Sequence, residues 1–482
     1  MKKRNKIISL LILVAISCEY VNYFSTIKAK AAEDKNTVNV EAKESKESEE
    51  NKTVIRDNID EIRKLFIGLD NKIVINGKKQ VIPINLDNAA TTPVLKKVMK
   101  AVLKASENYG SIARGDGQKS QYSSDLYEEC RRYVIKYFNA PLNKYTAIFV
   151  SNTTEGINKL SNILIKNKND IVITSRMEHH SNDLPWRGKC DLKYVEVDEK
   201  GRIIMEELEE MFNIYKERIK YVTITGASNV SGYITDIRKV AKLAHKYGAK
   251  VIIDGAQLVP HREVNMCGEE DDDYIDFLIF SAHKVYAPFG SGAIIGLRDE
   301  LEKYPPDTKG GGTVERVLDD EIIWLSTPEK NEAGSPNFFG AVALMQALKE
   351  MNKIGLELIE NNEKKLLKML IDGMKNFERV ILYGDNENIE DRLGIMVFNI
   401  DRLCYEMVGE YLASIRGIAV RQGGFCAHPY TRRLLGIKSD EIEEYIARNG
   451  MPGMVRVSLG AYNSEKEVNI FLETIEYICK KC

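Results

Sequence analysis

The sequence predicts an α/β fold with a mostly parallel sheet in a large domain, followed by a smaller C-terminal α+β domain. Between residues 145 and 281, short β-rich segments alternate with helical ones, and the β-rich segments are apolar almost throughout. Strands of this kind are buried on both faces, as in parallel sheets covered by helices. The chain also has 482 residues, too many for one small core, so a large domain and a smaller one are expected.

The strands and helices follow from residue type and spacing. The predicted strands are 145–150, 170–175, 221–225, 249–254 and 276–281. A helical segment, 154–167, follows the first strand, and an amphipathic helix, 236–248, ends at Gly248. Apolar residues also recur at helical spacing over 54–66, and a long helical region over 338–377 leads into the C-terminal domain.

The N-terminus differs from the rest of the chain. A basic start, MKKRNK, precedes about a dozen apolar residues, which is too short to span a bilayer but suits a signal peptide. We therefore expect a signal-like or anchor segment over 1–32, which favours export or membrane anchoring. A charged, disordered linker is expected over 33–53. The large domain with its N-terminal segment is predicted to span 54–345, and the small domain 346–482.

Composition and cysteine spacing argue against nucleic-acid binding, a disulfide framework and a C-terminal metal site. The chain carries 69 Lys and Arg against 71 Asp and Glu, a net charge of −2, which offers no general electrostatic attraction for nucleic acid. Its eight cysteines are scattered and do not resemble a disulfide framework. Cys479 and Cys482 form a terminal CxxC without a second ligand pair, so we predict no metal site there.

Polar residues gather where the predicted strands end. They are Thr153 and Thr154, His179, Asn229, Asp254 and Gln257, and the trio Ser281, His283 and Lys284. Each has a structural alternative, such as a helix cap, a core histidine or a turn. Their joint occurrence at five strand ends favours a ligand site, because ligands of parallel sheets bind at the carboxyl ends of the strands.

These residue types suit pyridoxal 5'-phosphate. A lysine forms a Schiff base with the aldehyde, an aspartate faces the protonated pyridine nitrogen, and a helix N-terminus binds the phosphate. Lys284, Asp254 and the helix beginning near Thr153 are the candidates. His179 can cover the face of the ring, while Ser281 and His283 are placed to reach the phosphate.

Nine motifs in order carry a resemblance to a known family. They are LDNAATTP (86–93), SNTTEGIN (151–158), EHHSNDLPW (178–186), SNVSG (228–232), DGAQ (254–257), SAHK (281–284), EAGSPN (332–337), VRQGGFCAHP (420–429) and RVSLGAYN (456–463). The chain resembles the class V aminotransferase family of fold-type I pyridoxal-phosphate enzymes. Within that family it is most similar to the group II cysteine desulfurases and selenocysteine lyases, over about residues 85–475.

The resemblance implies roles at the cofactor end. Lys284 is the Schiff-base lysine, Asp254 pairs with the pyridine nitrogen, Gln257 reaches the ring hydroxyl and His179 stacks on the ring. The implied phosphate-binding residues are Thr153, Thr154, Ser281 and His283, with Ser335 reaching the phosphate of the partner subunit in a homodimer. Relatives of this kind are expected in the cytoplasm, which conflicts with the signal-like start.

At the substrate end, the resemblance implies that Asn229 and Arg456 bind the substrate carboxylate and that Arg421 lies near it. Cys426 matches the thiol that takes sulfur from the substrate. The chain departs from the nearest desulfurases just before Cys426, where Gly424 and Phe425 replace a histidine pair.

The expected reaction is therefore removal of sulfur from L-cysteine, giving alanine and a persulfide on Cys426. A sulfur-acceptor protein is an expected partner. The alternatives are another class V reaction (transamination, epimerisation or selenocysteine lysis) or an exported, non-catalytic protein of the same fold.

Overall fold

The computed structural model describes residues 59–77, 79–113 and 115–481. The predicted signal-like segment and charged linker lie outside the described residues, as does the start of the predicted helix over 54–66. The described part of that helix is α3 (Ile59–Arg63). No helix within the described ranges is long and apolar enough to cross a membrane.

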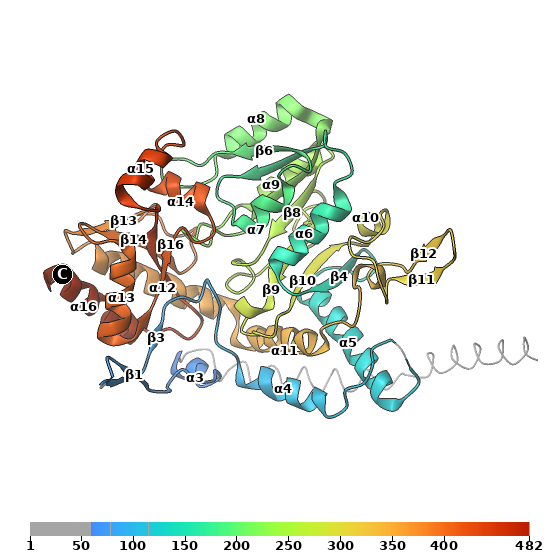
Figure 1. The fold of residues 1–482 in the computed structure, drawn as a ribbon, viewed down its shortest axis with the longest axis horizontal. Helices are drawn as coiled ribbons and strands as arrows, with labels where there is room; N and C mark the ends of the chain where they lie inside the picture. The colour runs from blue at the N-terminus through green and yellow to red at the C-terminus, as the bar shows by residue number, and fades with distance from the viewer. Residues whose placement is uncertain (1–58, 78, 114, 482) are drawn as a thin grey trace, which may run out of the picture. The chain divides into compact units, whose positions relative to one another are not determined.

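A seven-stranded sheet forms the centre of the chain (Figure 1), and its order is β4-β10-β9-β8-β7-β5-β6. The strands are β4 (Tyr145–Val150), β5 (Ile171–Ser175), β6 (Asp191–Val195), β7 (Ile219–Thr225), β8 (Lys250–Asp254), β9 (Phe277–Ser281) and β10 (Gly292–Leu297). Only β10 runs antiparallel to its neighbours, β4 and β9. The predicted α/β class with a mostly parallel sheet is therefore confirmed.

Helices cover both faces of this sheet. Along β4, Ile148 and Val150 join the buried cluster under α6 (Thr153–Leu164), whereas Phe149 packs with α5 (Gln118–Tyr137) and α11 (Phe338–Ile354). Alternate residues of a strand point to opposite faces, so one apolar run supplies two cores. This explains why the β-rich segments are apolar without interruption.

A second sheet lies toward the C-terminus. It is antiparallel, with the order β13-β14-β17-β16, from β13 (Val380–Leu382), β14 (Ile395–Ile400), β16 (Arg421–Gly423) and β17 (Met454–Ser458). Its core includes side chains of α12 (Leu356–Met374), α13 (Tyr405–Arg416) and α16 (Glu465–Lys481). The predicted boundary between large and small domains stays a prediction.

The predicted helical region over 338–377 is divided. Gly355, with φ of 88°, separates α11 from α12. A positive φ suits glycine, which has no Cβ, and it interrupts the helical path.

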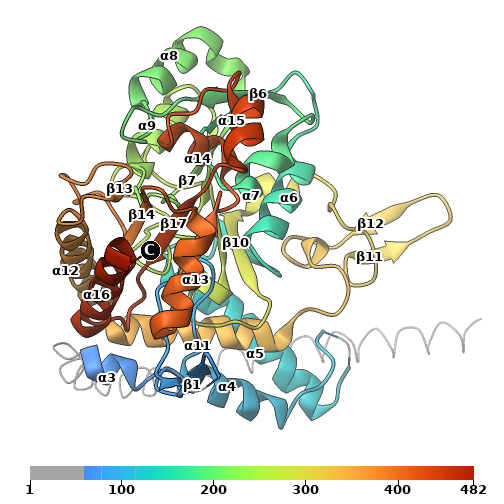
Figure 2. The ribbon, with the colours of Figure 1, turned by 60° about the vertical axis from the view of Figure 1, so that its left-hand side comes forward.

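The remaining elements connect these layers (Figures 1 and 2). The helices are α4 (Lys96–Ser106), α7 (His180–Asp183), α8 (Met205–Tyr215), α9 (Ile237–Lys246), α10 (Arg298–Glu302), α14 (His428–Leu434) and α15 (Ile442–Asn449). Short 3-10 turns in the described residues are 184–186, 216–218, 282–284 and 329–331. The short strands are β1 (Ile73–Ile75), β2 (Lys79–Val81), β3 (Ile84–Asn85), β11 (Val314–Val317), β12 (Ile322–Trp324) and β15 (Ile418–Ala419).

Candidate active site

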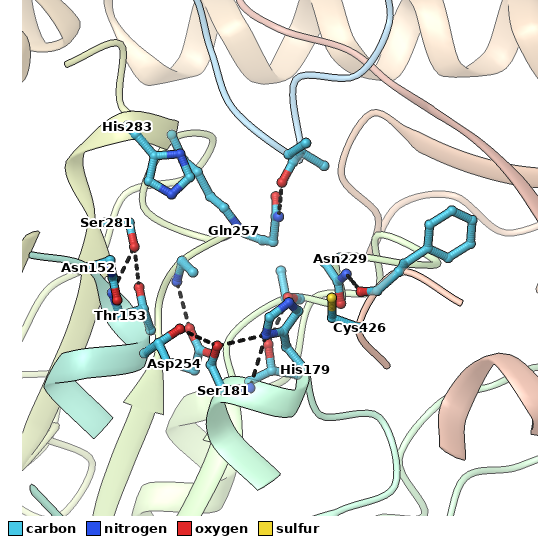
Figure 3. A pocket seen from close by; sticks show the side chains of 18 of the residues that line it. Asn152, Thr153, His179, Ser181, Asn229, Asp254, Gln257, Ser281, His283 and Cys426 are labelled. Atoms are coloured by element: carbon cyan, nitrogen blue, oxygen red, sulfur yellow. Dashed lines mark hydrogen bonds between the residues drawn. The ribbon is translucent and has the colours of Figure 1, made fainter. Parts of the chain in front are cut away.

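A cavity of about 490 Å³ opens at the carboxyl ends of the central strands (Figure 3). Every predicted site residue except Ser335 lines it: Thr153, Thr154, His179, Asn229, Asp254, Gln257, Ser281, His283, Lys284, Arg421, Cys426 and Arg456. They come from both sheets, so segments far apart in the sequence share one site.

Lys284 follows β9 directly, at the end of a short 3-10 turn over 282–284. Its amine has no hydrogen-bond or ion-pair partner in the described part of the chain. Burial lowers the pKa of Lys284 to about 8; Arg456 adds to this shift, while Asp254 opposes it. A lysine with a lowered pKa holds more of the neutral, nucleophilic amine near neutral pH.

Asp254 ends β8, the strand beside β9, and is 3% exposed. Its Oδ1 accepts a hydrogen bond from the backbone of Ala256 at 3.0 Å, and no cation forms an ion pair with it among the described residues. Burial raises the pKa of Asp254. A buried carboxylate without a cation is costly unless a positive or donor group comes to it. Gln257 lies nearby, and its amide donates to the backbone oxygen of Ala89 at 2.7 Å.

The N-terminus of α6 borders the cavity. Asn152 caps this twelve-residue helix by accepting from the backbone of Glu155. Ser281 Oγ accepts from the backbone N–H of Thr153 at 2.8 Å and lies 2.7 Å from the Thr153 hydroxyl. Hydroxyls and a helix N-terminus together favour an anionic group.

His179 is held in one orientation by Ser181. The backbone N–H of Ser181 donates to Nδ1 of His179 at 3.1 Å, so the ring proton belongs on Nε2. Burial, with Lys284 and His180, lowers the pKa of His179 to about 3. The Ser181 hydroxyl also lies 2.6 Å from that of Thr154. The sequence prediction missed Ser181; its position in the first turn after His179 is the signal that could have revealed it.

His283 immediately precedes Lys284 in the sequence and also lines the cavity. Its Nδ1 is 3.2 Å from the hydroxyl of Thr91. Burial and the neighbouring Lys284 lower the pKa of His283 to about 4. Both histidines of the cavity are therefore neutral near pH 7, which leaves positive charge there to lysine and arginine.

Arg456 on β17 is 3% exposed and is held by two partners. Its Nη1 donates to the backbone oxygen of Asn229 at 2.9 Å, and its Nη2 to Asp87 at 2.8 Å. Its Nε is buried without a partner in the described residues. Arg421 lies opposite Arg456 on the adjacent strand and is exposed. Asp87 was not singled out from the sequence, although it lies within the motif LDNAATTP.

Cys426 lies on the turn after β16 and is exposed. Phe425 and Cys426 have φ of 51° and 53°, so two consecutive residues other than glycine occupy the left-handed region. Two hydrogen bonds hold them there: the Asn229 amide donates to the oxygen of Phe425 at 2.8 Å, and the His180 N–H donates to the oxygen of Cys426 at 2.6 Å. The Phe425 ring also lies over the Arg456 guanidinium, 5.2 Å from ring centroid to Cζ.

Ser335 is not brought to this cavity. It is exposed and lines a separate cavity of about 230 Å³, which shares Ser151 and Gly290 with the first. In the described ranges, no cluster of three or more His, Cys, Asp or Glu side chains is arranged to hold a metal ion.

Comparison with known proteins agrees with this arrangement. The family model described as Aminotransferase class-V matches residues 84–471. The chain is 32% identical over 417 residues to the "Probable cysteine desulfurase 1" of Mycobacterium leprae (strain TN). This match covers 84% of this chain and 63% of that protein. It is 32% identical over 402 residues to the "Probable cysteine desulfurase" of a Synechocystis species, covering 82% of this chain and 90% of the relative.

A solved structure is also similar. The apo cysteine desulfurase from Thermococcus onnurineus NA1 superposes with a TM-score of 0.73 at 32% identity, and the match covers 83% of this chain and 95% of that one.

Proposed function

Because the chain belongs to the class V aminotransferase family, we propose that it is a pyridoxal-phosphate-dependent cysteine desulfurase, which converts L-cysteine to alanine and leaves the sulfur as a persulfide on Cys426. The observation that carries the proposal is the composition of the main cavity. It combines a half-buried lysine with a lowered pKa, a buried carboxylate without a cation, and an exposed cysteine. The names of the relatives support the same activity.

The described residues fit pyridoxal phosphate. Asp254 offers the buried negative charge that a protonated ring nitrogen requires, and Lys284 offers an amine without a partner to bond to the aldehyde carbon. Thr153, Thr154, Ser281 and His283 are the proposed phosphate-binding residues, with Gln257 at the ring hydroxyl and His179 against the ring face. The chemistry that the group supplies when bound is an electron sink for bonds at the α-carbon of the amino acid.

Lys284 and His179 handle protons in this proposal. Lys284, with its pKa lowered to about 8, can both accept and return a proton at the α-carbon near neutral pH. His179 stays neutral because its pKa is lowered to about 3, so it adds no positive charge that would lower the pKa of Lys284 further. Its Nδ1 is already an acceptor for Ser181, which leaves the Nε2 proton as its donor.

Arg456 and Asn229 are the proposed carboxylate-binding residues. A guanidinium can form two parallel hydrogen bonds to a carboxylate, and Arg456 retains N–H groups beyond those used by Asn229 and Asp87. Asp87 holds the guanidinium of Arg456 in place through its ion pair with Nη2. Arg421 is exposed, and we propose that it adds positive charge at the mouth of the site rather than a buried contact.

Cys426 performs the sulfur transfer. Its thiolate attacks the sulfur of the substrate, a new S–S bond forms, and the bond between that sulfur and the β-carbon breaks. The β-carbon then takes a proton, and the product is alanine. Gly423 and Gly424 precede the turn, so its backbone can change conformation more easily than a regular strand.

We further propose a homodimer and the division into a large domain to residue 345 and a small domain from residue 346. The exposure of Ser335 and its absence from the main cavity support a role toward a partner subunit. Sedimentation of the purified protein tests the dimer, and a monomer at micromolar concentration would contradict it.

The decisive experiment is product identification. Purified protein is incubated with pyridoxal phosphate and a panel of amino acids that includes L-cysteine, and the products are identified by mass spectrometry. Alanine from cysteine is expected, together with one sulfur atom added to Cys426 as a persulfide. Dithiothreitol, added afterwards as the reductant, should release that sulfur as sulfide. Cys426→Ser should bind the cofactor but release no alanine from cysteine, while the control Cys267→Ser, which changes an exposed cysteine outside the cavity, should remain active. Alanine release by Cys426→Ser at the parent rate would remove Cys426 from the mechanism.

A further inference from the structure

A third cavity, of about 320 Å³, lies beside the turn that carries Cys426. Residues from α14 and α15 form much of its lining, and these two helices lie side by side in both views (Figures 1 and 2). The lining combines three arginines, Arg176, Arg432 and Arg433, with the ring of His428 and with apolar side chains that include Ile442 and Ile446. We call it the α14–α15 cavity.

The lining of the cavity holds three arginines and no carboxylate side chain, so its charges are balanced only from outside the lining. Glu196 pairs with Arg433 at 2.6 Å and also with Arg176 at 3.2 Å. Arg432 forms no ion pair among the described residues, and its Nη1 donates instead to the backbone oxygen of Ile437. Burial lowers the pKa of Arg432, and the cations Arg433 and Arg176 act in the same direction, against Glu196 and Asp440. An anion bound beside Arg432 would relieve this repulsion.

The apolar part of the cavity belongs to a helix that packs poorly. No residue of α15 is buried. Ile442 and Ile446 are four positions apart and therefore lie on one face, which the cavity leaves partly open. Met451, just beyond the helix, is 55% exposed. An apolar face of this kind beside cationic groups fits a ligand that has both acidic and apolar side chains.

The α14–α15 cavity is adjacent to the Cys426 turn. His428, which lines the cavity, is two residues after Cys426, so their Cα atoms are at most about 7 Å apart. His180 connects the two: its N–H donates to the oxygen of Cys426, and its ring contacts that of His428, with the centroids 4.5 Å apart. A ligand in the cavity is therefore beside the residue proposed to carry the sulfur.

We infer that the α14–α15 cavity binds an acidic, partly apolar segment of the protein that accepts sulfur from Cys426. This inference rests on the proposed desulfurase function. The acceptor's thiolate attacks the outer sulfur of the Cys426 persulfide, a new S–S bond forms on the acceptor, and the bond to Cys426 breaks. Cys426 leaves as a thiolate, so the transfer needs no oxidant or reductant.

Two synthetic peptides test the inference. Each has one cysteine flanked by leucines, and the outer residues are glutamates in one peptide and lysines in the other. Enzyme loaded with pyridoxal phosphate is given one equivalent of L-cysteine, and alanine release is measured first. Each peptide is then added, and sulfur transfer to it is followed by mass spectrometry, with 2-mercaptoethanol as an uncharged thiol.

The acidic peptide should accept sulfur about tenfold faster than the basic one at low salt, because charge complementarity mainly raises association rates. Arg432→Glu should remove this preference and leave both alanine release and transfer to 2-mercaptoethanol unchanged. The control Arg402→Glu makes the same charge change at a side chain that is 86% exposed and outside the cavity, and it should keep the preference. Equal rates for the two peptides, or a preference that survives Arg432→Glu, overturns the inference.

Failure of the proposed function gives a different result. If no alanine is released, the desulfurase proposal fails. Binding of fluorescent serine versions of the two peptides, measured by anisotropy, then shows whether the cavity itself selects acidic segments. Equal binding of the two serine peptides overturns the inference whatever the alanine result.

Discussion

Replacing Arg456 with lysine tests whether binding of the substrate carboxylate depends on the shape of the guanidinium or only on its positive charge. The positive charge remains near Asp87, so this carboxylate keeps a cation beside it, but the guanidinium's pair of parallel N–H donors is lost. Arg456 uses Nη1 and Nη2 on Asn229 and Asp87 and has a free Nε among the described residues. A lysine has only one donor atom, so it cannot keep these contacts and also form two hydrogen bonds to a substrate.

The magnitude follows from the number of bonds lost. One hydrogen bond to a charged group contributes about 1.5–3 kcal/mol. Since about 1.4 kcal/mol corresponds to a factor of ten, KM for cysteine should rise between about 10-fold and about 150-fold. Arg421→Lys, at the exposed neighbouring position, should change KM less than about threefold, because exposed charges contribute little.

The assay is alanine formation as a function of cysteine concentration for the parent and both variants. The absorption spectrum of the bound cofactor and the thermal unfolding midpoint are measured as controls for folding. A KM for Arg456→Lys within twofold of the parent, with the cofactor bound normally, would refute the role assigned to Arg456.

Three further predictions address the cofactor end of the cavity. Borohydride reduction of the protein with pyridoxal phosphate should attach the cofactor to Lys284, as found by peptide mass spectrometry; attachment to another lysine would contradict the proposed site. Lys284→Met should raise the free energy of unfolding of cofactor-free protein below about pH 8. That gain in unfolding free energy should shrink between about pH 8 and pH 10.5, because the folded pKa of Lys284 is lowered to about 8 from 10.5 and the unfolded chain binds more protons in that range. Denaturant unfolding at about pH 7 and about pH 9.5 measures the gain at each pH. A gain that does not depend on pH argues against an ammonium group that is destabilised in the folded state. Ser181→Ala should weaken pyridoxal phosphate binding by about tenfold, since two hydrogen bonds of about 0.5–1.5 kcal/mol each are lost at Thr154 and His179; an unchanged affinity by fluorescence titration would show that Ser181 does not position them.

The central sheet could be predicted because its parallel strands are short, apolar and separated by helices. β10 was not predicted: Gly292 begins it and Gly296 interrupts its apolar residues. Its antiparallel direction depends on pairing with β4 and β9. β6 is a half-exposed edge strand with charged residues, so it lacks the continuous apolar pattern. The break at Gly355 depends on a backbone angle that helical periodicity does not reveal.

Some residues of the site could also be predicted from the sequence, and others could not. Lys284 and Asp254 could be predicted because each directly ends an apolar strand. Asp87 acts through a hydrogen bond from Arg456, which is distant in sequence, and no local pattern marks such a contact. The contact of Ser181 with Thr154 is likewise not local, although its place beside His179 is a local signal. The left-handed backbone of Phe425 and Cys426 was also beyond prediction, since it is stabilised by hydrogen bonds from Asn229 and His180, which follow strands of the central sheet.

The site draws its groups from two sheets, and this has a consequence for engineering. Lys284 and Asp254 are fixed by adjacent central strands, whereas Arg421, Cys426 and Arg456 belong to the C-terminal sheet and the turn that follows β16. The turn over 423–428 can therefore be exchanged for that of a relative without altering any strand of the central sheet. Such an exchange would change the substrate end of the site and leave the residues that attach the cofactor in place. This turn is therefore the segment to redesign when a different reaction on the substrate is wanted.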